Sequence, residues 1–292
     1  MNSAVFNFTY KKHGEIIIYI GRILMKSLIQ IVLVIFIFCS MCTLSPIPVH
    51  GEDAGFEEIL TKAKQGDADA QYKLGEMYMY GEGVVQDDKE SIKWYSEAAR
   101  SYRKLAEKND VEAQFRLSDM YKFGEGVIQD LNEGVKWLIK AAEHGHPQSQ
   151  YLLGWMYQNG NSVPQDDKEA ARWYSKAAEQ GHIEAQYMLG QMYQAGKGVK
   201  QDFKKSVQWL KKAAEQGYSQ AQFDLGWMYE QGEGVPQDYI TAYAWYSLAA
   251  SQNNDGAKYN RDLVLTKMSS NQIEVGQKLS KKLFDEIYNQ SK

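Results

Sequence analysis

Cysteine is almost absent from this chain of 292 residues. The two cysteines, Cys39 and Cys42, both lie in an apolar run near the N-terminus. The rest of the sequence therefore has neither a disulfide framework nor the thiolates of a structural zinc site.

A basic excess is missing as well. The chain holds 33 Lys and Arg against 37 Asp and Glu; four of the basic and one of the acidic residues lie in residues 1–51, which leaves 29 against 36 and a net charge near −7 for the rest. Nucleic-acid-binding proteins generally need a basic face to neutralise phosphates. We therefore predict that nucleic acid is not a partner. Hydrophobic residues make up 44% of the chain, which is enough to build a folded core.

Catalytic motifs are also missing. The sequence contains no nucleophile elbow, phosphate loop or metal-ligand motif, and its Gly-x-Gly steps follow helical patterns, which marks them as turns. His144 and His146 form a histidine pair, but a metal site needs further ligands that the sequence does not indicate. We predict a non-enzymatic protein without catalytic residues, cofactor or metal.

The first 51 residues are typical of a leader with a secretory signal peptide. Residues 28–44 are almost all apolar, a short basic start precedes them, and a helix-breaking stretch with two prolines follows. This order predicts cleavage near Gly51. Residues 1–24 are a long leader for such a signal, and Met25 is suited to be the true first residue.

Two other interpretations of this segment stay open. If it is not cleaved, an apolar run of this length just spans a bilayer and would anchor the chain in the membrane. Alternatively, Cys42 would be lipidated, although bulky Met41 precedes it where a small residue is expected. The predicted location is periplasmic or secreted, or, with an anchor, membrane-attached and facing the periplasm.

What the sequence does contain is a unit of about 36 residues, present five times. Its most regular mark is a glutamine after Ala or Ser, with spacings of 43, 36, 36 and 36, and we number units one to five by these residues: Gln71, Gln114, Gln150, Gln186 and Gln222. Leu-Gly, Met-Tyr, a Gly-x-Gly-Val turn, Gln-Asp, Trp-Tyr or Trp-Leu, and an Ala-Ala pair follow in register. Two single small residues depart from this pattern, Ser118 in unit two and Ser162 in unit three.

The unit predicts a helical hairpin. The turn glycines end the first helix because glycine tolerates a left-handed φ, and the Asp of Gln-Asp caps the second helix. Asp87 with Glu90, and Asp166 with Glu169, have the spacing of a capping box. Each Leu-Gly glycine would cost a free helix about 1 kcal/mol relative to Ala, so we expect it to mark a close contact between helices.

The first spacing carries seven additional residues, around residues 100–105. Seven residues are close to two helical turns. The second helix of unit one is therefore expected to lengthen without rotating its buried face, and Tyr102 to repeat the phase of Tyr95.

The flanking segments are expected to cap the array, because the end units of a solenoid have no neighbour. We predict an N-terminal capping helix in residues 52–68, the five units in residues 69–256, and C-terminal capping helices in residues 257–292. Ser269 and Gln272 suit the start of the last helix.

The unit resembles the Sel1-like repeat, a relative of the tetratricopeptide repeat. The resemblance covers about residues 54–292 and rests on Ala-Gln-x-x-Leu-Gly, Tyr-x-x-Gly-x-Gly-Val, Asp and Trp-Tyr-x-x-Ala-Ala in register. It implies an all-α fold, a right-handed α/α superhelical solenoid, and a role as an adaptor or scaffold for protein complexes, often exported in bacteria. A cysteine-rich branch of that family has reported β-lactamase activity; the units here lack those cysteines, so this activity is not expected.

Comparing the five units with one another indicates where a ligand would bind. At about 100° per residue, the constant positions of the first helix occupy one arc, and the variable positions 2, 5 and 9 residues after each glutamine cluster opposite. We predict that this free face is a concave protein-binding surface formed by Lys73, Glu76, Tyr80, Arg116, Asp119, Phe123, Leu152, Trp155, Met188, Gln191, Asp224 and Trp227.

The free face has an apolar stripe rimmed by charge, which suits a peptide or helix, and Trp is a frequent binding hot spot. The alternative is that Trp155 and Trp227 only pack against neighbouring helices. The predicted function is a non-enzymatic scaffold or adaptor outside the cytoplasm that binds a peptide or protein segment. Two other functions stay open: an envelope enzyme or glycan-binding protein, and a membrane-anchored regulator of a membrane complex.

Overall fold

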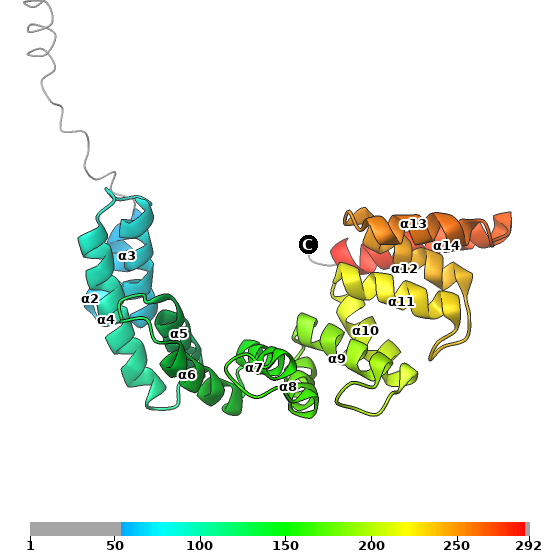
Figure 1. Ribbon diagram of the computed structural model, residues 1–292. Helices are drawn as coiled ribbons and strands as arrows, with labels where there is room; N and C mark the ends of the chain where they lie inside the picture. The colour runs from blue at the N-terminus through cyan, green and yellow to red at the C-terminus, as the bar shows by residue number, and fades with distance from the viewer. Residues whose placement is uncertain (1–53, 290–292) are drawn as a thin grey trace, which may run out of the picture.

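The computed structural model describes residues 54–289, so the predictions about the leader, its cleavage, its anchoring and Cys42 lie outside the described residues. Within residues 54–289 every regular element is a helix (Figure 1), and none of these helices is long and apolar enough to cross a membrane. The elements are α2 (Ala54–Lys64), α3 (Ala68–Tyr80), α4 (Asp88–Ala106), α5 (Val111–Phe123), α6 (Leu131–Glu143), α7 (Pro147–Asn159), α8 (Asp167–Glu179), α9 (Ile183–Ala195), α10 (Phe203–Glu215), α11 (Ser219–Gln231), α12 (Tyr239–Ser251), α13 (Asp255–Leu265), α14 (Ser270–Phe284) and a π-helical turn, η1 (Asp285–Asn289).

Ten of these helices form five stacked hairpins, one for each sequence unit: α3 with α4, α5 with α6, α7 with α8, α9 with α10, and α11 with α12. The predicted all-α solenoid is thus confirmed. In Figure 1 the stack curves into an arch, with α2–α6 in one arm, α9–α14 in the other, and α7 and α8 at the bend.

The turn inside each hairpin follows from its sequence. Five glycines with φ between 68° and 77° end the first helices, as predicted, and five aspartates cap the second helices. The predicted capping boxes are not closed, however. The backbone N–H of Asp87 donates to Tyr78 O at 2.9 Å, and that of Asp166 donates to the matching tyrosine of its own hairpin. Because this backbone donor is already bonded, Glu90 pairs with Lys93 instead.

The mid-helix glycines mark close contacts between the two helices of a hairpin, which confirms that prediction. A Cβ added at Gly75, Gly154 or Gly226 would lie 2.7–2.8 Å from a tyrosine ring carbon of the second helix, and one at Gly190 would lie 2.8 Å from Leu210 Cγ. The Ala-Ala pairs of the second helices are buried alongside them in units one to four. Small residues therefore set the distance between helices.

Buried glutamines tie each unit to the one before it. The Nε2 of Gln150 donates to Ala142 O at 3.0 Å, at the end of the preceding unit, and its Oε1 accepts from Gln180 Nε2 at 2.8 Å, at the end of its own hairpin. The other four unit glutamines donate to the preceding helix in the same way at 3.0–3.1 Å. Gln71 differs at its Oε1, which is buried and has no hydrogen bond within residues 54–289. The residue 30 positions further on, which supplies the partner in the other units, lies inside the longer α4.

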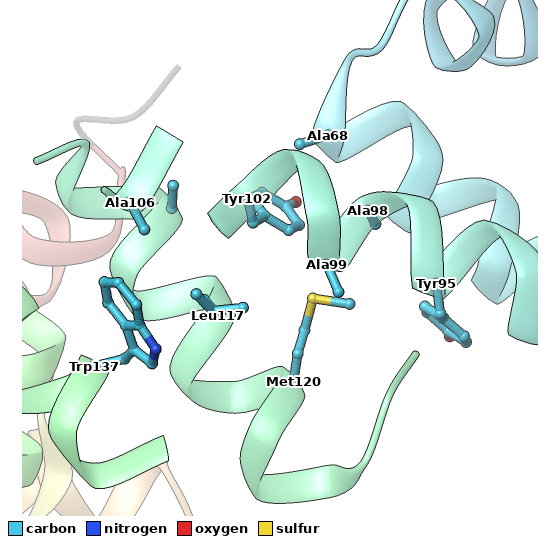
Figure 2. Close-up of a cluster of buried hydrophobic side chains, with 10 residues drawn as sticks. Ala68, Tyr95, Ala98, Ala99, Tyr102, Ala106, Leu117, Met120 and Trp137 are labelled. Carbon is cyan, nitrogen blue, oxygen red and sulfur yellow. The ribbon is translucent and has the colours of Figure 1, made fainter. Parts of the chain in front are cut away.

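The helix α4 has 19 residues, against 13 in the second helices of the other units. Tyr95 and Tyr102 are both buried in the cluster drawn in Figure 2, which also contains Met120 and Trp137 of unit two. The additional residues thus lengthen the helix without turning its buried face, as predicted from their number.

Helices cover both ends of the array. At the N-terminal end, Phe56 and Ala63 of α2 join the buried cluster of unit one. At the C-terminal end, α14 starts with the predicted capping box between Ser269 and Gln272. Tyr288 in η1 accepts hydrogen bonds from the Gln222 and Gln252 side chains at 3.0 and 2.6 Å, so the last turn completes the glutamine contacts of unit five.

A buried carboxylate connects unit five to α13. Glu230 on α11 accepts a hydrogen bond from the Tyr246 hydroxyl at 2.9 Å through one oxygen and pairs with Lys267 Nζ at 2.8 Å through the other. Asn260 on α13 donates to the same tyrosine oxygen at 3.3 Å. Both acceptor oxygens of this buried charge are therefore satisfied.

Candidate protein-binding face

All twelve side chains of the predicted free face lie outside the buried core. Three large ones are well exposed: Tyr80 (68%), Phe123 (60%) and Trp155 (42%). Helical phase alone thus separates these positions from the core, while their role in binding stays a prediction.

The charged members of units one and two pair mainly with neighbours on their own hairpin. Lys73 Nζ lies 3.1 Å from Glu76 and 3.4 Å from Glu82, and Arg116 lies 2.8 Å from Glu112. Exposed pairs of this kind contribute at most about 1 kcal/mol each. These pairs therefore hold the charged side chains only weakly.

Gln191 and Asp224 are joined across units four and five. Gln191 Nε2 lies 3.3 Å from an Asp224 oxygen and 2.5 Å from the Tyr187 hydroxyl. Burial raises the pKa of Asp224 above its ordinary value, while hydrogen bonds from Gln191 and Tyr187 oppose the rise. This end of the free face is therefore a closed polar network.

Met188 and Trp227 are only partly exposed and contribute to packing. Met188 packs against the buried cluster of units three and four, and Trp227 packs against the buried clusters on both sides of α11. The packing role that the sequence left open for Trp227 is thus present in the structure.

Asp119, Leu152 and Trp155 line one cleft at the junction of units two and three, with a volume of about 190 Å³. Its other walls come from α5, α6 and the turn after α7, and include Ser118, Leu131, Gly134, Val135, Leu138 and Ser162. The structure therefore brings together three of the predicted residues on a shared, mostly apolar surface.

The sequence comparison missed the α6 side of this cleft, which Leu131, Val135 and Leu138 form, because it compared only the first helices. The sequence nevertheless contained a signal for this cleft. Ser118 and Ser162, the two departures from the unit pattern, both line the cleft. A break in a repeat can therefore mark a site that the regular positions do not.

The histidine pair has structural partners. His144 Nδ1 lies 2.8 Å from Gln114 Oε1, and His146 caps α7 and stacks on Phe115 with ring centroids 4.5 Å apart. Within residues 54–289 no group of three or more His, Cys, Asp or Glu side chains is placed to hold a metal ion.

The repeated hairpins and their glycine turns correspond to a known family. The Sel1 repeat family model matches residues 68–101, 111–146, 147–182, 183–218 and 219–254, one match for each of the five units. The chain belongs to the Sel1 repeat family. Proteins of this family generally mediate protein–protein interaction and are typically non-enzymatic scaffolds.

Solved structures resemble the chain to different degrees. A Sel1 repeat protein from Oxalobacter formigenes is 32% identical with a TM-score of 0.57, and the match covers 78% of this chain and 99% of that one. Cysteine-rich protein B from Helicobacter pylori is 29% identical with a TM-score of 0.35, over 48% of this chain and 96% of that one. An immunity protein from Pseudomonas aeruginosa is 27% identical with a TM-score of 0.38, over 76% of this chain and 80% of that one. A comparison with curated proteins finds no significant match.

Proposed function

We propose that the chain is a non-enzymatic scaffold that acts outside the cytoplasm and binds a peptide or protein segment on the concave face of its solenoid. The observation that carries this proposal is the exposure of Tyr80, Phe123 and Trp155 on the free face. Exposed large apolar side chains that cluster on one face are typical of interaction sites. The general role of the Sel1 repeat family supports the same function.

A crosslinking experiment in living cells tests the binding face. A photo-reactive amino acid replaces Phe123 on the free face or, as the control, exposed Lys211 on the second helix α10. We expect one discrete crosslinked product from position 123 and none from position 211. Equal labelling at both positions, or none at either, would count against a scaffold that uses this face.

The proposed location rests on the signal-like pattern of the first 51 residues. N-terminal sequencing of the protein recovered from the cell envelope or the medium tests it. A new N-terminus near Gly51 supports export with cleavage, whereas an intact apolar segment in the membrane fraction favours the anchored regulator. An intact protein in the cytoplasmic fraction would rule out both.

A further inference from the structure

The cleft between units two and three exists where the repeat pattern breaks. In units two, four and five the second turn glycine touches the helix of the preceding unit. A Cβ there would lie 2.2 Å from Tyr95 C for Gly126, 2.0 Å from Asp167 O for Gly198, and 2.3 Å from Phe203 O for Gly234.

Unit three has Ser162 at this position, in the same left-handed conformation with φ 61°. Its Cβ does not fit at such distances from a backbone, so this turn must stand further from α6 than the others stand from their neighbours. Ser162 and Leu131 both line the cleft. The serine therefore holds the junction open.

The matching junction between units four and five uses larger side chains. Phe203 stands where unit two has Leu131, Ser206 where it has Gly134, and Trp227 where unit three has Trp155. Phe203 and Trp227 both pack against the buried cluster there. At the open junction, by contrast, Leu131 is 58% exposed.

The exposed large apolar side chains of the five units are distributed unevenly along the solenoid. Within residues 68–254 all of them belong to units one to three: Tyr80, Val85, Ile92, Leu105, Phe123, Ile128, Leu131 and Trp155. Two of them, Leu131 and Trp155, line the cleft, so a partner that contacts these exposed side chains can insert a side chain between them.

The charge beside the cleft indicates the partner. Asp119 lines it and has no hydrogen-bond or ion-pair partner among the described residues. Glu125 lies close enough that Asp119 and Glu76 add to the rise that burial causes in its pKa. One lysine, Lys122, also lines the cleft. Burial raises the pKa of Asp119, and Lys122, Arg116 and His146 oppose that rise, but none of the three forms an ion pair with it. A cationic group of a partner can therefore pair directly with Asp119 and offset its repulsion of Glu125.

We propose that the cleft binds one large apolar side chain of a partner peptide, with a Lys or Arg of that peptide next to it paired with Asp119. This inference rests on the proposed function, binding of a protein segment. A cavity of roughly 150 Å³ holds benzene, so about 190 Å³ takes one aromatic or large aliphatic side chain.

Peptide selection tests the inference. A phage-displayed library of random 12-residue peptides is selected on the purified full-length chain, and the enriched sequences are synthesised and titrated by fluorescence anisotropy. We expect enriched peptides to share a large apolar residue next to Lys or Arg. Replacing that basic residue with Glu should weaken binding at least tenfold, and Asp119→Asn should weaken it several-fold and flatten its salt dependence.

Two variants address the cleft itself. Leu131→Phe places the side chain of Phe203 in the open junction, and Ser162→Gly lets the turn approach α6; each should weaken binding at least tenfold. Tyr259→Ser, which removes a large exposed side chain of α13 (66% exposed) far from units one to three, is the matched control and should leave binding unchanged. Far-UV circular dichroism verifies that the variants are folded. If Leu131→Phe does not fold, Ser162→Gly still tests the cleft.

Three results would overturn the inference. The enriched peptides carry acidic residues beside the apolar one, no sequence is enriched, or the folded cleft variants bind the peptides as tightly as the unaltered chain does. Crosslinking at position 123 separates its failure from that of the proposed function. A discrete crosslinked partner without cleft-dependent peptides leaves the scaffold standing and removes only the cleft.

Discussion

The glycine in the middle of each first helix allows a sharp test of helix packing. Gly226→Ala adds a methyl carbon 2.8 Å from Cδ1 of Tyr246. Non-bonded carbons prefer about 3.5–4.0 Å, so the ring or α11 must move by roughly 1 Å. The ring is fully buried, and its hydroxyl bonds to Glu230, which Lys267 also holds. It therefore has little room to yield.

Two effects of opposite sign set the size of the change. Ala is favoured over Gly in a helix by about 1 kcal/mol, whereas overpacking a core costs about 1–3 kcal/mol. Because the ring of Tyr246 is held at both ends, we expect overpacking near its upper range. The net loss should be about 1–2 kcal/mol, which lowers Tm by roughly 2–8 °C in a domain of this size.

Gly256 on α13 supplies the matched control. A Cβ there would lie 3.5 Å from its nearest neighbours, an ordinary contact, so Gly256→Ala should keep or raise Tm. Thermal unfolding by far-UV circular dichroism compares the two variants, and hydrogen exchange should localise the loss in Gly226→Ala to α11 and α12. If Gly226→Ala unfolds at or above the temperature of the unaltered chain, helix propensity alone decides and the packing argument is refuted.

Three further predictions concern the glutamine contacts, the long helix and the buried carboxylate. Gln150→Ala removes a donor and an acceptor that are both bonded, so it should lower the free energy of unfolding by about 1 kcal/mol more than Gln71→Ala, whose acceptor has no partner; equal losses in urea titrations would contradict this. Deleting residues 96–102 from α4 should leave a folded chain, because removing seven residues preserves the helical phase. Deleting residues 96–100 instead rotates the following turn by about 140° and should abolish cooperative unfolding of units one and two. Comparable unfolding curves for the two deletions would disprove the phase argument. Burial raises the folded pKa of Asp224, so the contribution of Asp224 to stability is full at low pH and is lost as pH rises through that pKa. Asp224→Asn should therefore raise Tm at pH 7 and leave it unchanged near pH 3. An effect on Tm that does not depend on pH would show that the charge of Asp224 is not the cause.

The cleft changes how the free face should be interpreted. Trp155 and Trp227 occupy the same position in their units, and the sequence offered the same two roles for both. In the structure Trp227 packs against buried clusters and Trp155 lines a cleft. The difference lies in what each junction offers: Phe203 beside one tryptophan, Leu131 beside the other.

The sequence by itself determined the hairpin, the number of units, the turn glycines and the phase of α4, because these depend on residues within about two turns of one another or on an exact repeat of spacing. The separation of the free face from the core followed from the same helical period. Only the tertiary structure decided that Glu90 closes no capping box, since Tyr78 already accepts the backbone hydrogen bond of Asp87. It also decided that Ser162 borders a cleft. That outcome depends on how the turn of one unit meets the helix of the unit before it, a contact between segments about 30 residues apart. The break in the repeat at Ser162 marks the position in the sequence but does not show this contact.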